Sequence, residues 1–133
     1  EGVAGVRGDR FDRWQDYMTC LIGVGAQIVR EAPALLRLTY GMPGTLTEAR
    51  QIGKSLDGKI VRTVYAALNE RFVLPELPER ERILALTFTI IDSLFRYSFR
   101  EDGEITDAAA REAGRAAIAY MRCYLPEYLE LRA

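Results

Sequence analysis

The sequence predicts an all-α fold, a single bundle of about five main helices, and three observations support this. Apolar residues recur at spacings of three and four along most of the 133 residues. No stretch alternates apolar and polar residues as a half-buried strand does, and capping residues and prolines recur at intervals that suit short connections between helices. Hydrophobic residues make up 49% of the chain. Residues 1–133 are therefore expected to form one domain with a real core.

Two helices are predicted at the start of the chain. A long one is expected over Asp9–Arg30, with Asp9 as its cap and an apolar stripe that includes Trp14 and Met18. A short one follows over Pro33–Gly41, because proline suits the first position of a helix and glycine its end. The short helix would connect the first long helix to the next.

A third helix is predicted to begin near Thr45, whose spacing to Glu48 is that of a capping box, and to end before Pro75. Gly53 and Gly58 lie inside it. Each costs about 1 kcal/mol relative to alanine in a helix. This helix is therefore expected to bend or to yield at these positions.

The last two predicted helices carry more apolar surface than one domain can cover. The fourth, expected over 78–100, has only a narrow polar stripe and so needs cover on more than one face. The fifth begins after the cap Thr106 and runs to about Leu125, with a stripe of mostly alanine that lets helices approach closely. A second copy of the chain can cover both, so we expect a homodimer in which these helices form an intermolecular four-helix bundle. The expected interface residues are Ile90, Leu94, Tyr97, Ala109, Ala113, Ala116, Ala117, Tyr120 and Tyr124.

Composition excludes several kinds of catalysis. The chain has no histidine, which removes Ser-His-Asp and Cys-His systems, histidine metal sites and the commonest general base near neutral pH. Cys20 and Cys123 lie far apart and form no CxxC motif, so both are expected to be small, buried, reduced thiols. We therefore expect no enzyme activity, no metal and no cofactor.

Charge and hydropathy limit the classes of partner that the chain is expected to bind. A net charge of −1 provides no basic face for a phosphate backbone, so the chain is not expected to bind DNA by itself. The longest uncharged run, 17–29, is shorter than the about 20 residues that a membrane span requires. No secretion signal opens the chain. A soluble, cytoplasmic protein without a membrane partner is expected.

One acid lies in an otherwise apolar segment, "TFTIIDSLFRYSF" (87–99). On a helix, Asp92 shares a face with Phe88, Phe95 and Phe99. Asp92 is either a pocket acid that orients a cationic or hydroxyl-bearing ligand, or a structural acid that accepts hydrogen bonds from a tyrosine or an arginine at the helix-helix contact, such as Arg96 or Arg122. The structural role is the favoured one.

Two longer segments carry a family resemblance. "EAPALLRLTYG" (31–41), between two long helices, and "LTFTIIDSLFRYSFREDGEITDAAAREAGRAAIAYMRCYLPEYL" (86–129) resemble the C-terminal regulatory domain of tetracycline-repressor-type (TetR) transcriptional regulators. The resemblance covers the chain from about Asp9 to its end. The helix-turn-helix of that family has no counterpart in 1–8, so the chain is expected to lack the DNA-binding domain.

The resemblance implies a homodimeric regulator that binds a small, hydrophobic or aromatic effector, with DNA bound only through the missing domain. It also implies an effector pocket between the first, third and fourth helices, gated by the short second helix. The residues expected to line it are Trp14, Tyr17, Met18, Leu21, Tyr40, Ile60, Thr63, Val64, Ala67, Phe88, Ile91, Asp92 and Phe95. Each of these can instead belong to the core, because aromatic stripes at helical spacing usually pack on one another.

Two other functions remain open at this point. One is a helical oligomerisation module without a ligand, in which the apolar fourth helix serves assembly alone. The other is an all-α enzyme without histidine that uses Asp92, Glu48 or tyrosines. The sequence shows no pair of polar groups that would favour the enzyme.

Overall fold

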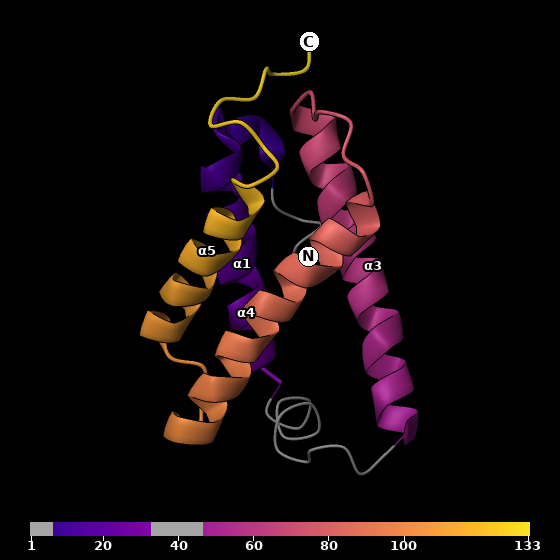
Figure 1. The fold of residues 1–133 in the computed structure, drawn as a ribbon. Helices are drawn as coiled ribbons and strands as arrows, with labels where there is room; N and C mark the ends of the chain where they lie inside the picture. Colours follow the sequence, from indigo (N-terminus) through magenta and orange to yellow (C-terminus); the bar gives the residue numbers. More distant parts are fainter. Residues whose placement is uncertain (1–6, 33–46) are drawn as a thin grey trace.

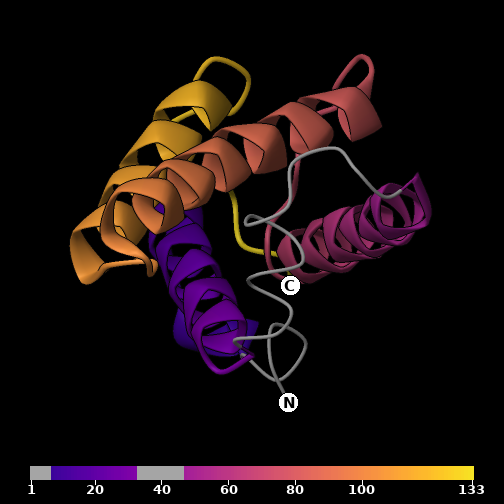
Figure 2. The same ribbon diagram turned by 90° about the horizontal axis from the view of Figure 1, so that it is seen from below.

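The computed structural model describes residues 7–32 and 47–133, and for 47–57 it describes the backbone alone. These ranges contain four α-helices, which are α1 (Trp14–Arg30), α3 (Thr47–Arg71), α4 (Arg80–Asp102) and α5 (Asp107–Met121), together with the 3-10 turn η2 (Gly8–Arg10). Helices α4 and α5 pack against each other, α1 packs on α5, and α3 packs on α4 (Figure 1). Viewed along the bundle, α4 crosses from the α1–α5 side to α3 (Figure 2). The all-α prediction is confirmed.

The first helix begins later than predicted. Helix α1 starts at Trp14, and Asp9 lies in η2 instead of capping the helix. Arg7 donates a hydrogen bond to the Asp9 carboxylate (Nη2 to Oδ2, 2.9 Å) and lowers its pKa. The Phe11 ring stacks on Tyr17, with centroids 5.1 Å apart. The segment before α1 is therefore held against the side of α1, and this contact prevents it from extending the helix.

The later boundaries agree more closely with the sequence. Helix α3 ends at Arg71, before Pro75, and runs without interruption through Gly53 and Gly58. The Thr106 hydroxyl accepts a hydrogen bond from the Ala109 amide at 3.1 Å and caps α5 as predicted. Helix α5 ends at Met121, one turn before the prediction. The expected short helix over 33–41 and the Thr45 cap lie outside the described residues.

The turn between α4 and α5 is fixed by buried polar contacts. Ser98, 2% exposed, donates to the Glu104 carbonyl at 2.7 Å and accepts from the Thr106 amide at 3.1 Å. At the end of α1, Arg30 donates to the Ile105 carbonyl and forms an ion pair with Asp107 at 3.0 Å. These contacts set the antiparallel arrangement of α4 and α5 and attach it to α1.

One hydrophobic core joins the helices. It is centred on the aromatic residues at the start of α1 and on the end of α3, where Trp14 and Phe72 are fully buried. Its buried members are Trp14, Tyr17, Met18, Leu21, Ile22, Ala26, Val64, Leu68, Phe72, Ile91, Phe95, Ile105, Ala113, Ala117, Ile118, Met121 and Leu125. Small residues of α5 in this set allow α1 and α4 to approach it closely.

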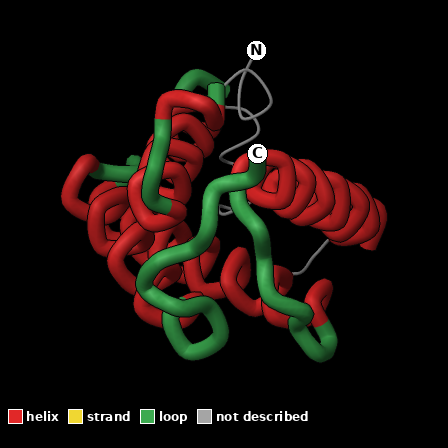
Figure 3. Tube along the Cα trace, turned by 90° about the horizontal axis from the view of Figure 1, so that it is seen from above, coloured by secondary structure: helices red, strands yellow, loops and turns green. Residues whose placement is uncertain are grey.

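After α5 the chain turns back across one end of the bundle. Figure 3 shows this segment running over the helix ends towards the end of α3. There Phe72 and Leu131 form an isolated antiparallel backbone bridge. The C-terminal segment therefore contacts elements that lie far from it in sequence.

Candidate functional site

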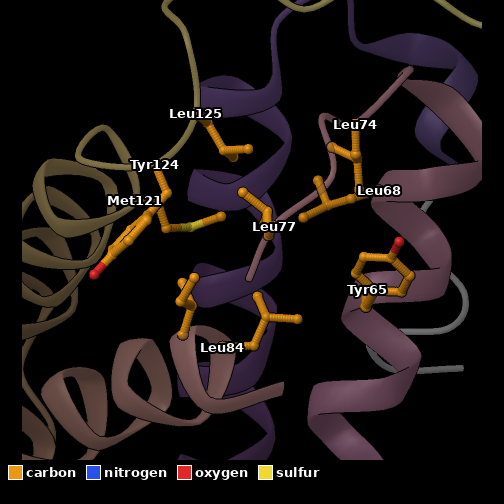
Figure 4. Close-up of a pocket in the computed structure, with 9 residues that line it drawn as sticks. Tyr65, Leu68, Leu74, Leu77, Leu84, Met121, Tyr124 and Leu125 are labelled. Carbon is orange, nitrogen blue, oxygen red and sulfur yellow. The ribbon is translucent and has the colours of Figure 1, made fainter. Parts of the chain in front are cut away.

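An apolar cavity lies among the C-terminal half of α3, the 72–79 connection, the start of α4 and the end of α5 (Figure 4). Its volume is about 20 Å³, enough for roughly one water-sized sphere. Its walls are aliphatic, apart from one methionine and two tyrosines. The lining residues are Tyr65, Leu68, Leu74, Leu77, Ile83, Leu84, Met121, Tyr124 and Leu125.

The 72–79 connection forms one wall of the cavity. Leu74 and Leu77 stand next to Pro75 and Pro78, which prevent this segment from continuing either helix. Figure 4 shows Leu77 between the side chains from α3 and those from α5. Glu79, which ends the connection, has a positive φ of 51° and turns the chain into α4. An extended, non-helical segment thus closes the cavity.

The cavity adjoins an open surface depression of about 800 Å³, and the two share Tyr65, Leu74 and Leu77. Arg80 lies over the Tyr65 ring, 4.1 Å from its centroid, and donates to the Tyr65 hydroxyl at 3.1 Å. Arg82 pairs with Glu79 at 3.3 Å on the same rim. An apolar interior therefore opens towards a charged mouth, with Tyr65 at the boundary.

The residues predicted to line an effector pocket have other places in the structure. Trp14, Tyr17, Met18, Leu21, Val64, Ile91 and Phe95 are buried members of the core. Ala67 and Phe88 are half-buried against it, whereas Ile60 and Thr63 are exposed and Tyr40 lies outside the described residues. None of those that the structure describes lines the cavity described above. Whether they form a second pocket with the short second helix remains a prediction.

Asp92 lies on the same side of α4 as Phe88 and Phe95, at its edge. Its side chain is 44% exposed and accepts a hydrogen bond from Arg96 at 3.0 Å. Arg122, the other partner considered for it, binds Glu127 instead. The pair with Arg96 lies along α4 itself and is half-exposed, and the structural role of Asp92 stays a prediction.

Two residues of the cavity, Leu74 and Leu77, were missed because their signal is not periodic. Leucines at positions 74 and 77 of a proline-containing connection follow no helical stripe, yet exposing both would be unfavourable. That pair was the available sign that the connection folds back onto the bundle. Tyr124 was anticipated only as an interface residue.

Most of the expected interface residues reach the protomer surface. Tyr97 and Tyr124 are 56% and 42% exposed, and Leu86, on the same stripe of α4, is 44% exposed. The half-buried members of the expected interface are Ile90, Leu94, Ala109, Ala116 and Tyr120.

Two alanines require a correction. Ala113 and Ala117 are fully buried within the protomer, where their small side chains admit the neighbouring helices. They cannot contact a second copy.

The described residues contain no group of three or more histidine, cysteine or acidic side chains placed to hold a metal ion. Both cysteines are free thiols. Cys123 was expected to be buried, but it is exposed. No described helix is both long enough and apolar enough to cross a membrane.

Fold and site together define an all-α domain with an apolar cavity between its helices. Residues 12–123 match the family described as "Tetracyclin repressor-like, C-terminal domain". The match covers most of the chain, and the chain belongs to this family. The comparisons find no significant match to a curated protein or to a solved structure.

Proposed function

We propose that this chain is the regulatory domain of a TetR-type transcriptional regulator. It binds a small hydrophobic or aromatic effector and forms a homodimer, so that the effector changes DNA binding by a separate domain of the protein. The observation that carries the proposal is an apolar cavity open to a surface depression, in a chain of this family. Apolar walls with few polar groups are typical of small-molecule sites.

The cavity has to widen before it can hold an effector, since it now accommodates only a water-sized sphere. Its most adjustable wall is the 72–79 connection, which carries Leu74 and Leu77 and lacks helical hydrogen bonds. Tyr65 stands at the mouth under Arg80. We infer that an effector which separates Leu77 from α5 shifts the connection, and a ligand that binds this shifted arrangement more tightly would favour it.

The dimer is assigned to the exposed apolar stripe of α4 and the neighbouring edge of α5. Leu86, Ile90 and Tyr97 lie on one side of α4, away from Phe88 and Asp92. Tyr120 lies on the matching edge of α5, where the nearby Tyr124 hydroxyl raises its pKa. Covering this stripe removes apolar side chains from water in both copies.

A blocking substitution tests the effector site. Leu84→Trp is designed to fill the cavity, whereas Ile28→Trp places the same side chain on the exposed face of α1, away from the proposed dimer stripe. Naphthalene and indole serve as rigid apolar probes, and the melting temperature is measured with and without each. A ligand at 100 times its Kd stabilises by about 2.7 kcal/mol.

We expect the probes to raise the melting temperature of the wild type and of Ile28→Trp, and to have no effect on Leu84→Trp. An equal rise in both variants would place the probe elsewhere. The absence of any rise in all three proteins would favour the oligomerisation module, to which the small cavity volume also points.

A further inference from the structure

The segment that follows α5 is attached to two distant parts of the fold. We call residues 126–132 the strap. It lies beyond residues 12–123, the part that matches the family. It begins directly after Leu125, a cavity wall residue, and crosses the bundle end to α3 (Figure 3).

The first half of the strap binds the start of α1. The indole N–H of Trp14 donates to the Pro126 carbonyl at 2.9 Å, and the side-chain Nε2 of Gln15 donates to the Glu127 carbonyl at 2.8 Å. Trp14 is fully buried and Gln15 is 5% exposed. Releasing the strap would leave two buried donors without these acceptors, which is unfavourable.

Glu127 adds a charged link between the strap and two helices. Its carboxylate accepts both guanidinium hydrogen bonds of Arg122, at 2.9 and 3.1 Å, and pairs with Arg13 at 3.1 Å. Arg13 also lies over the Tyr128 ring, 5.4 Å from its centroid. The start of α1 and the end of α5 are thus joined through one side chain.

The second half of the strap binds the end of α3. The Val73 amide donates to the Glu130 carbonyl at 2.8 Å, and the Arg132 amide donates to the Arg71 carbonyl at 2.9 Å. The Arg132 guanidinium donates to the backbone carbonyl of Asn69 at 2.6 Å and to its side-chain oxygen at 2.9 Å. The second half of the strap is therefore paired with the end of α3 through backbone hydrogen bonds, and the Arg132 side chain stabilises this pairing.

Both attachments of the strap adjoin the cavity wall. Leu125 precedes Pro126, and Leu74 follows Val73, so each wall residue is one peptide bond from a strap contact. Displacing Leu74 or Leu125 therefore moves a residue bonded to the strap or to α1.

We propose that the strap couples the cavity to the start of α1, so that a change in cavity packing alters how firmly the first turn of α1 is held. The proposal rests on the proposed effector site for its purpose. The coupling between the cavity and the start of α1 does not depend on that site, because coupling between two places is measurable without a ligand. The coupling is carried by the hydrogen bonds that the strap makes to α1 and α3, and it does not rest on proximity alone.

The test is a double-mutant cycle on the whole chain, read by amide hydrogen exchange. Leu84→Ala enlarges the cavity, and Ile28→Ala, exposed on α1 and away from the proposed dimer stripe, is its control. Each is made in the wild-type strap and in a weakened strap that carries Glu127→Ala and Arg132→Ala. Leu84→Met replaces Leu84→Ala if the latter does not fold.

The readout is protection of the Tyr17 amide, which donates to the Arg13 carbonyl at 3.2 Å. It is normalised to the Gly103 amide, bonded to Phe99 at the far end of α4. With the strap intact, we expect Leu84→Ala to lower the normalised protection of Tyr17 by about 2- to 30-fold, the range that couplings of 0.5–2 kcal/mol produce. With the strap weakened, the effect should shrink to that of Ile28→Ala.

Three results would overturn the proposal. Equal effects of Leu84→Ala in both strap backgrounds would assign the coupling to the core, and no effect in either would remove the coupling. An equal effect of Ile28→Ala with the strap intact would show a general loss of stability. Since no ligand is present, failure of the effector probes leaves this result unaffected, and the two proposals fail separately.

Discussion

The exposed residue Glu127 connects the strap to the start of α1 and to the end of α5. Its side chain receives hydrogen bonds from Arg122 and Arg13, and its backbone carbonyl accepts from Gln15. The hydrogen bond from Arg122 is the largest cause of a lowered pKa of the Glu127 carboxyl, with Arg13 contributing. Its ionised form is therefore stabilised in the folded state.

This lowered pKa predicts a pH-dependent stability. A carboxyl whose pKa falls on folding stabilises the protein above its unfolded pKa, here about 4.5, and loses that contribution as pH drops through the folded value. Glu127→Gln should therefore melt below the wild type at pH 7, and the difference should vanish as the pH falls well below 4.5. Thermal melts across pH 2–7, about five pH units spanning the titration, measure this.

Glu130→Gln is the control, because Glu130 joins the strap pairing through its backbone carbonyl. A deficit of Glu127→Gln that stays constant across the pH range would show that the side chain acts by shape and not by charge.

At the scale of elements, helix ends were predictable where a local cap sets them. The start of α5 could be identified because Thr106 and the Ala109 amide are three residues apart. The start of α1 could not, because contacts between Phe11 and Tyr17 and between Arg71 and the Phe11 carbonyl hold the preceding segment. Those contacts join residues brought together only by the fold.

The connection between α4 and α5 gives a stability prediction. Ser98→Ala removes both the donor to Glu104 and the acceptor for the Thr106 amide in a buried site. Leaving buried partners unsatisfied costs about 1–3 kcal/mol of unfolding free energy. Urea denaturation should show this loss.

Ser93→Ala, on the exposed side of the same helix, is the matched control and should change stability by less than about 0.5 kcal/mol. If the two variants unfold at the same urea concentration, the Ser98 contacts do not hold the turn.

For the whole molecule, the sequence indicated which residues are apolar but not what covers them. The alanine stripe of α5 was expected at a dimer interface, yet Ala113 and Ala117 are covered within the protomer. The leucines that wall the cavity lie partly in a non-periodic connection, and their neighbours come from three helices. Periodicity assigns a face to a residue, whereas the partner of that face depends on the tertiary arrangement.

The dimer prediction changes accordingly. Ala117→Arg, which would test the interface if Ala117 faced a partner, is expected to unfold the protomer because it places a charge in the core. Leu86→Arg is the sharper test, since this side chain is 44% exposed. Light scattering should show a dimer for the wild type and a monomer for Leu86→Arg, with helix content unchanged by circular dichroism.

Ile28→Arg is the control, because Ile28 is similarly exposed, at 42%, on α1. If both arginine variants stay dimeric, the α4 stripe is not the interface. If both become monomeric, charge alone disrupts the assembly.

The position of Trp14 has an optical consequence. It is the only tryptophan of the chain, it is fully buried, and its indole N–H is bonded to Pro126. Its fluorescence should therefore be blue-shifted while the strap is closed, and should move to longer wavelength when water reaches the ring. The protein carries its own reporter for strap release, and a spectrum recorded during any titration would follow that motion without a label.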